Sequence, residues 1–132
     1  MENNKIIYMD NAATTFVDKR VLDYVMPYLT DKCYNPSSIY DGASEVHDAI
    51  DLARNIIAKS LNAKDKEIVF TSCGTESDNY AIKGFAYANA DKGKHLITSK
   101  IEHHAVLHTM KSLEKDGFEV TYLDVDENGL VD

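Results

Sequence analysis

One short turn in the chain has residue types that could hold a negatively charged group. Ser72, Cys73, Gly74 and Thr75 follow the apolar run 68–70 and precede apolar residues at helical spacing. A strand, a small polar turn and a helix start leave backbone N–H groups exposed at the positive end of a helix dipole. This pattern predicts an anion site, most often for phosphate. A turn without a ligand is the alternative, because neither a P-loop lysine nor the three glycines of a dinucleotide fingerprint is present.

Other residues near this turn and beyond it could also do chemistry. A thiol at a helix start tends to have a lowered pKa, so Cys73 is either a reactive cysteine or, as the sequence favours, a buried and inert small residue in a tight turn. His104 and His108 stand four apart, a spacing that can bind zinc. Because no H-E-x-x-H pattern and no third ligand accompany them, we expect no metal site.

The elements that must position these residues follow from hydrophobic spacing. Thr75 and Asp78 stand at capping-box spacing, so a helix is expected to begin at Thr75. From residue 67 onward strands and helices alternate, which predicts βαβ units and a mostly parallel sheet in a three-layer α/β/α fold. Ligands in such sheets bind at the carboxyl ends of strands. The expected strands are 6–9, 67–72, 95–99 and 119–125, and the expected helices are 19–29, 43–61, 75–89 and 103–116.

Length and composition bound the class of protein. The chain has 132 residues, one domain's worth, and its 44% hydrophobic content is typical of a soluble globular protein. The formal net charge of −8 argues against a nucleic-acid partner. No apolar run has membrane-spanning length and no signal peptide is seen, so we expect a cytoplasmic protein without membrane contact. Its two cysteines are too few for a disulfide framework.

The end of the chain presents a difficulty for this fold. The last predicted strand is followed only by a turn, so the sheet would keep unpaired edges and uncovered apolar surface. The sequence is therefore expected to be the beginning of a larger protein, and the isolated chain is expected to self-associate. We divide it into residues 1–18, an amino-terminal strand and loop, and residues 19–132, an incomplete α/β domain.

Several motifs together resemble one known family, the cysteine desulfurases of the NifS/IscS type in the class V aminotransferase group. In chain order the motifs are YMDNAATT, NPSS, ARNIIAKSLNA, EIVFTSCGTESDN, GKHLITSKIEHHAVL and GFEVTYLDVDENGLVD. The resemblance runs through essentially the whole chain, which corresponds to about the first third of a typical family member. It implies the amino-terminal part of the large domain of a fold type I enzyme dependent on pyridoxal 5'-phosphate.

The resemblance also implies an activity and partners for the parent protein. Such enzymes are cytoplasmic homodimers that convert L-cysteine to L-alanine and leave the sulfur as an enzyme-bound persulfide. The sulfur then passes to an acceptor or scaffold protein for iron–sulfur cluster or thio-cofactor synthesis. Relatives of the same fold act as selenocysteine lyases, kynureninases or class V aminotransferases, and these remain alternatives within the enzyme class.

The resemblance assigns roles to individual residues. Cys73, Gly74 and Thr75 match the turn that holds the cofactor phosphate, in agreement with the helix-start argument. His103 matches the residue that stacks on the pyridine ring and moves protons, and an imidazole with an ordinary pKa near 6.5 suits both tasks. The residues expected on the substrate side of the cofactor are Asn11, Ala12, Ala13 and Thr14.

Some family features are replaced or missing. Tyr40 stands where the family usually has a histidine after the NPSS loop, and Cys73 stands where a glycine is commoner. No residue matches the Schiff-base lysine, the aspartate beneath the pyridine nitrogen, the substrate arginine or the sulfur-accepting cysteine. The 132 residues alone are therefore predicted to be inactive. The alternative to an enzyme fragment is a shortened, non-catalytic relative that binds a phosphate-bearing ligand or a partner protein.

Overall fold

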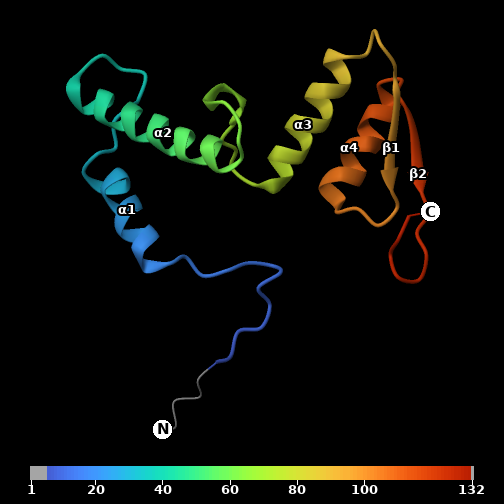
Figure 1. Ribbon diagram of the computed structural model, residues 1–132, viewed down its shortest axis with the longest axis horizontal. Helices are drawn as coiled ribbons and strands as arrows, with labels where there is room; N and C mark the ends of the chain where they lie inside the picture. Colours follow the sequence, from blue (N-terminus) through green and yellow to red (C-terminus); the bar gives the residue numbers. More distant parts are fainter. Residues whose placement is uncertain (1–5, 132) are drawn as a thin grey trace. The chain divides into compact units, whose positions relative to one another are not determined.

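The computed structural model describes residues 6–131, and the chain divides into two compact units between Ile68 and Val69. Among the described residues, the regular elements of the amino-terminal unit are all helices, whereas the carboxyl-terminal unit contains helices and a small sheet (Figure 1). Within the described residues, no helix is both long and apolar enough to cross a membrane.

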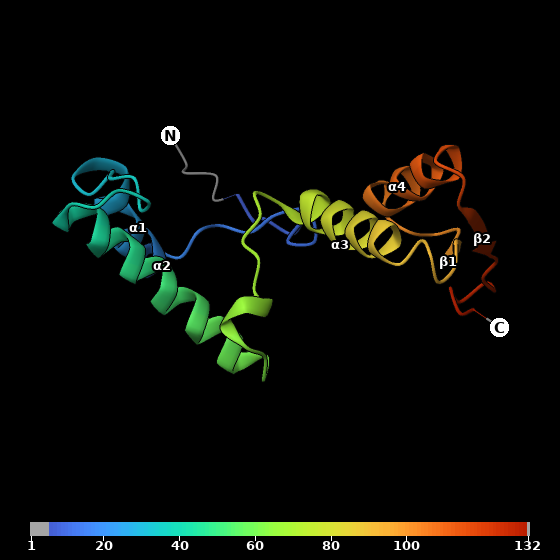
Figure 2. The same ribbon diagram turned by 90° about the horizontal axis from the view of Figure 1, so that it is seen from above.

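The amino-terminal unit holds two α-helices and one short 3-10 helix: α1 (Lys19–Thr30), α2 (Asp41–Ser60) and η1 (Asp65–Glu67). The Asp18 carboxylate caps α1 by accepting a hydrogen bond from the Arg20 backbone N–H at 2.8 Å. Helix α2, the long green helix of Figure 2, buries Ala43, Val46 and Ala58. The helices predicted at 19–29 and 43–61 are thus confirmed within two residues at each end.

Two of the four predicted strands are wrong. In the described part of the chain, residues 6–9 and 67–72 contain no strand, and residues 65–67 form the 3-10 helix instead. The side chains of Ile6 and Phe70 are 88% and 47% exposed. Branched and aromatic side chains favour an extended backbone, but a strand also requires a neighbouring strand to pair with its N–H and C=O groups. Neither segment has such a neighbour here.

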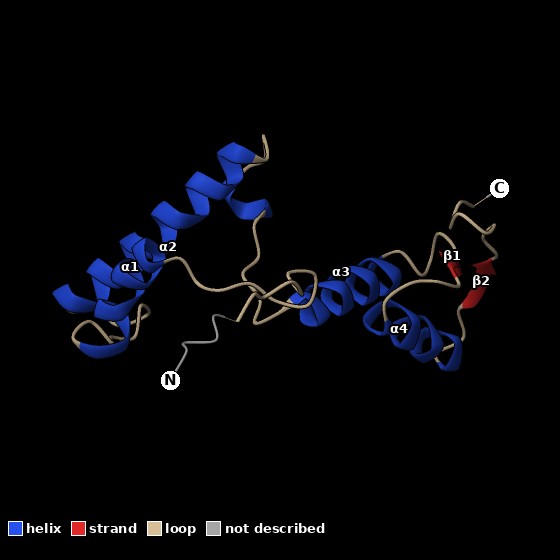
Figure 3. Cartoon of the chain, turned by 90° about the horizontal axis from the view of Figure 1, so that it is seen from below, coloured by secondary structure: helices blue, strands red, loops and turns tan. Residues whose placement is uncertain are grey.

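The carboxyl-terminal unit is a βαβ arrangement with one helix added before it, as Figure 3 shows with helices in blue and strands in red. Its elements in chain order are α3 (Gly74–Ala88), β1 (His95–Ser99), α4 (His104–Lys115) and β2 (Glu119–Leu123). The two strands are parallel and paired in register, with Leu96 opposite Val120. The α/β class with a parallel sheet is therefore confirmed.

A small core joins the helices of this unit to its sheet. Leu113 on α4 is fully buried and clusters with Ala86 on α3 and with Phe118, while Leu96 on β1 packs against this cluster. Helices α3 and α4 lie side by side and begin at the same end of the unit (Figures 1 and 2). Their shared start brings the two predicted site segments together.

Candidate functional site

The start of α3 differs from its predicted geometry. The helix begins at Gly74, and Cys73 rather than Thr75 is the N-cap residue. The turn is fixed by Glu76, whose Oε2 accepts hydrogen bonds from the Ser72 backbone N–H and the Ser72 hydroxyl, both at 2.6 Å. These bonds hold the pKa of the Glu76 carboxyl below its usual value. The predicted Thr75–Asp78 capping box is therefore wrong, because the pair that stabilises this start lies two to three residues earlier.

A second set of side-chain bonds holds the same turn. The hydroxyl oxygens of Thr71 and Ser77 lie 2.6 Å apart, and the Ser77 hydroxyl donates to the Cys73 carbonyl at 3.2 Å. Sequence reasoning missed Ser72, Ser77 and Glu76 as supports of the site. The available signal was the density of hydroxyl side chains around a helix start, where such groups bind backbone atoms locally.

Cys73 and Gly74 remain open to a ligand. The expected burial of Cys73 is wrong, because its thiol is free and exposed at the N-cap position. Its pKa is lowered chiefly by the backbone N–H of Glu76 and then by the Ser72 hydroxyl. A Cβ added to Gly74 would meet nothing within 4 Å, so the backbone here can be approached closely. Exposed amides at a helix start, next to a glycine, suit an anion.

His103 is the N-cap residue of α4. Its Nδ1 accepts a hydrogen bond from the Ala105 backbone N–H at 3.1 Å. The loop before it is tied to the strand ends, because the Lys100 N–H donates to the Leu123 carbonyl at 2.9 Å and the Lys100 ammonium lies 2.6 Å from an Asp124 carboxylate oxygen. The position of the His103 ring is thus set by the sheet and by the helix that follows it.

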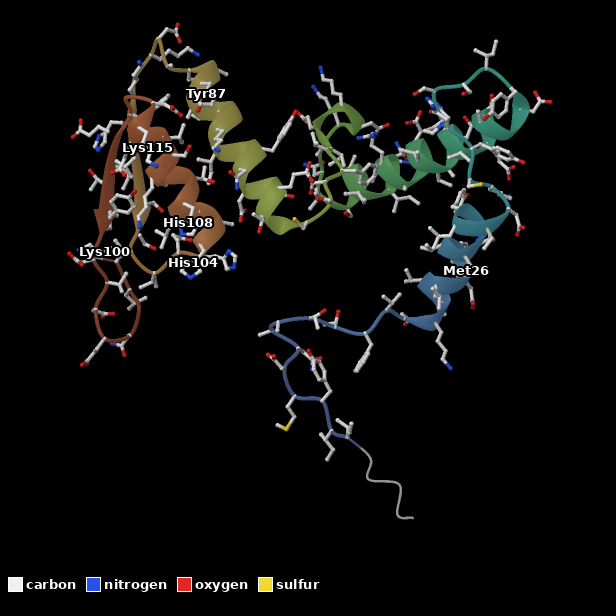
Figure 4. The ribbon with its side chains drawn as sticks, turned by 180° about the vertical axis from the view of Figure 1, so that it is seen from behind. Met26, Tyr87, Lys100, His104, His108 and Lys115 are labelled. Atoms are coloured by element: carbon white, nitrogen blue, oxygen red, sulfur yellow. The ribbon has the colours of Figure 1, made fainter. Side chains whose placement is uncertain are left out.

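Thr75 and His103 line one cavity. They were expected to follow neighbouring strands, but residues 67–72 form no strand, and the two residues meet because α3 and α4 begin at the same end of the unit. The cavity has a volume of about 360 Å³ and lies wholly within the carboxyl-terminal unit. Its other lining residues are Asn79, Lys83, His104, Ala105, His108 and Thr109. His104 and His108, labelled in Figure 4, stack with ring centroids 5.4 Å apart.

The charge of this cavity is opposite to that of the chain. The chain has a formal net charge of −8, yet the residues lining the cavity include one lysine and three histidines and no aspartate or glutamate. Hydroxyl groups of Thr75 and Thr109 complete a lining rich in hydrogen-bond donors. The cavity therefore favours an anionic ligand. Lys83 and Asn79 were not singled out from the sequence, although they follow Thr75 at successive helical turns.

The predicted substrate-side residues belong to the other unit. Residues 11–13 form an exposed turn in which the Ala13 N–H donates to the Asp10 carbonyl at 3.2 Å, and the Tyr8 hydroxyl contacts the Thr14 carbonyl oxygen at 3.1 Å. The substrate-side role of Asn11, Ala12, Ala13 and Thr14 stays a prediction, as do the roles of the cavity residues toward a cofactor.

Comparison with known proteins places this arrangement among a large group of relatives. Residues 7–132 match the aminotransferase class-V family. A cysteine desulfurase IscS from Methanosarcina thermophila is 60% identical over 128 residues, which are 97% of this chain and 32% of that protein. The chain thus spans about a third of the length of the curated relatives that it matches.

Solved structures agree with this match. A NifS-like protein superposes with a TM-score of 0.89 at 42% identity, covering 96% of this chain and 35% of that one. SspA in complex with cysteine superposes with a TM-score of 0.81 at 48% identity, covering 87% of this chain and 33% of that one.

Proposed function

The chain belongs to the aminotransferase class-V family, and we propose that it is the amino-terminal part of a pyridoxal-phosphate-dependent cysteine desulfurase. The parent enzyme converts L-cysteine to L-alanine and transfers the sulfur to an enzyme persulfide. The observation that carries this proposal is the meeting of Thr75 and His103 on one cavity without acidic lining residues, in a chain 60% identical to a cysteine desulfurase.

The turn before α3, of which Thr75 lines the cavity, and His103 on the cavity fit one end and one face of the cofactor. The exposed backbone at Cys73, Gly74 and Thr75 offers N–H donors and a hydroxyl for the phosphate, and no side chain occupies the space above Gly74. His103 is exposed beside this turn and offers the flat face of an imidazole to the pyridine ring. When bound, pyridoxal phosphate supplies an electron sink for the electrons released at the substrate's α-carbon.

The chain's own contribution is to bind and orient. The Thr75 hydroxyl and the first amides of α3 would hold the phosphate, and Lys83 adds positive charge further along the same cavity. His103 would pack on the ring and serve as the group that moves a proton. The residues that would attach the cofactor covalently and accept sulfur have no match in this sequence, so the chain alone is expected to produce no alanine.

Partners and location of the parent protein belong to the same proposal. We infer a cytoplasmic homodimer that passes sulfur to an acceptor or scaffold protein for iron–sulfur cluster or thio-cofactor synthesis. A cysteine-bound neighbour, SspA, supports L-cysteine as the substrate.

Reading the gene beyond residue 132 tests whether the chain is part of an enzyme. We expect the frame to continue and to encode a lysine after a strand, in a Ser-x-His-Lys-like context. The extended product should release alanine and sulfide from L-cysteine, while residues 1–132 should release neither. A stop codon directly after Asp132 would favour the shortened, non-catalytic relative.

Titration with cofactor tests the cavity itself. The chain should bind pyridoxal phosphate more tightly than pyridoxal, which lacks the phosphate, and inorganic phosphate should compete. Thr75→Val should weaken binding of pyridoxal phosphate about tenfold and leave that of pyridoxal unchanged, because one hydrogen bond to a charged group is lost. Thr98→Val, on strand β1, is the matched control. Equal binding of both compounds would contradict the proposed phosphate site.

A further inference from the structure

The hydrogen bond between α4 and His103 determines which ring nitrogen is free. The Ala105 N–H is a donor, so the His103 Nδ1 that lies 3.1 Å away must carry a lone pair rather than a proton. A neutral imidazole keeps one proton, which must then sit on Nε2. The helix cap therefore selects the Nε2–H tautomer of His103.

No carboxylate of the cavity can take up this Nε2–H. The cavity lining contains no aspartate or glutamate, and the nearest acidic residue in the sequence, Glu102, accepts a hydrogen bond from the Ser99 hydroxyl at 2.9 Å. The neighbouring side chains of His104, His108 and Lys83 add further nitrogen donors. The exposed Nε2–H is therefore available to an acceptor atom of a ligand.

We propose that His103 presents an Nε2–H donor to an acceptor atom of an anionic ligand in this cavity, and that it can accept a proton only when α4 gives up its cap. The identity of the ligand rests on the proposed function, whereas the tautomer is a property of the chain. Because His103 donates through Nε2–H, it favours ligands that present an oxygen or thiolate acceptor on its side of the cavity.

The number of protons on the His103 ring explains why proton uptake requires the loss of the α4 cap. If Nε2–H gave its proton away while Nδ1 remained an acceptor, the ring would become an imidazolate, which is inaccessible near neutral pH. If the ring took up a proton, the new N–H would form at Nδ1 and face the Ala105 N–H, so that hydrogen bond would break. Each net proton transfer through His103 is thus coupled to opening and closing of the first turn of α4.

Nitrogen NMR of the chain without any cofactor tests the tautomer. The chain labelled with nitrogen-15 at histidine is measured near pH 8, above the ordinary imidazole pKa of about 6.5. The His103→Asn variant identifies the His103 signals by their loss. We expect Nδ1 to show the shift of an unprotonated nitrogen and Nε2 that of a protonated one. A protonated Nδ1, or an averaged pair of shifts, would overturn the proposal and leave the proposed function untouched.

Hydrogen exchange at the Ala105 amide provides a second measurement. Asparagine is a good N-cap residue and alanine is a poor one, so His103→Asn should retain the protection of this amide. His103→Ala should raise its exchange rate about fivefold, the factor that corresponds to loss of a typical cap. His108→Ala, four residues further along α4, is the control and should leave the rate unchanged. Equal rates in the wild type and the Ala variant, or no recovery in the Asn variant, would refute the cap.

Discussion

At the turn before α3, Cys73 and Glu76 each receive hydrogen bonds that stabilise a negative form. The thiol faces the Glu76 N–H and the Ser72 hydroxyl, and the carboxylate accepts from two groups of Ser72. Both pKa values are lowered for this reason. The hydrogen-bond donors of Ser72 and Glu76 in this turn therefore already stabilise negative charge.

The first consequence concerns thiol reactivity. Because a lowered pKa increases the thiolate fraction at neutral pH, Cys73 should react with iodoacetamide faster than Cys33, the other free and exposed cysteine. Peptide mass spectrometry after short labelling measures the ratio. Ser72→Ala should lower the Cys73 rate. Faster labelling of Cys33 would show that the turn does not activate the thiol.

The second consequence concerns acid stability. A carboxyl whose folded pKa is depressed stabilises the fold above its unfolded pKa and loses this effect as the pH falls through the folded pKa. Glu76→Gln should therefore lower the melting temperature at pH 7, and the difference from the wild type should shrink below about pH 4.3, the ordinary Glu pKa. Glu127→Gln, on an exposed turn, is the control. A difference that persists unchanged at pH 3 would contradict the role of charge.

At the scale of the elements, α4 ends in a hydrogen-bonded turn that contains a glycine. The Phe118 N–H donates to the Leu113 carbonyl at 3.0 Å and the Gly117 N–H to the Glu114 carbonyl at 3.1 Å, while Gly117 has a φ of +87°. This is the left-handed conformation that glycine adopts after a helix. It turns the chain so that Phe118 enters the core directly before β2.

A glycine substitution tests this ending. Gly117→Ala should reduce the free energy of unfolding by about 1 kcal/mol, because a Cβ is disfavoured at positive φ. Gly93→Ala is the matched control, since Gly93 lacks a positive φ and an added Cβ there would meet nothing within 4 Å. Urea unfolding followed by circular dichroism measures both. Equal effects of the two changes would argue against the conformational explanation.

The elements also show what local sequence can predict. The four α-helices follow from apolar spacing, and β1 and β2 follow from apolar runs bounded by glycine-containing turns, since both strands find their partner within the same unit. The runs 6–9 and 67–72 have similar composition but no partner strand, and a run's composition cannot reveal that. At the site, Thr75 and His103 line one cavity although the strand expected before Thr75 is absent, because the parallel helices α3 and α4 bring their first turns together. The cap at Cys73 and the Glu76 bonds were not predictable, because several polar residues competed for one helix start.

On the scale of the whole molecule, the chain leaves apolar side chains exposed to solvent. Between α1 and α2 lies a cavity of about 560 Å³, lined by Tyr24, Val25, Tyr28, Ala49, Leu52, Ala53 and Ile56. The side chains of Leu52 and Ile56 are 62% and 59% exposed. Exposed apolar patches of this kind favour association, in agreement with the self-association expected from the sequence.

Ultracentrifugation over a range of concentrations checks this expectation. The wild-type chain should associate, and Ile56→Lys should shift it toward the monomer by placing a charge in the apolar cavity. Ile39→Lys is the control, because Ile39 is fully exposed and does not line the cavity. A wild-type chain that stays monomeric and binds no apolar dye would contradict the prediction.

The core of the carboxyl-terminal unit should lose stability when a buried apolar side chain is shortened. Leu113→Ala removes a fully buried side chain and should cost about 2–5 kcal/mol of unfolding free energy. Leu130→Ala, at a side chain 66% exposed, should change little. Denaturant titration compares the two variants. A small loss at Leu113 would mean that Ala86 and Phe118 close the space after truncation.

The common starting end of α3 and α4 has a consequence for how the cavity behaves in alkaline solution. The peptide units of a helix keep their dipoles at every pH. Because both helices begin at this cavity, their dipoles provide a permanent positive field that does not depend on protonation. Some capture of anions there should therefore persist in alkali.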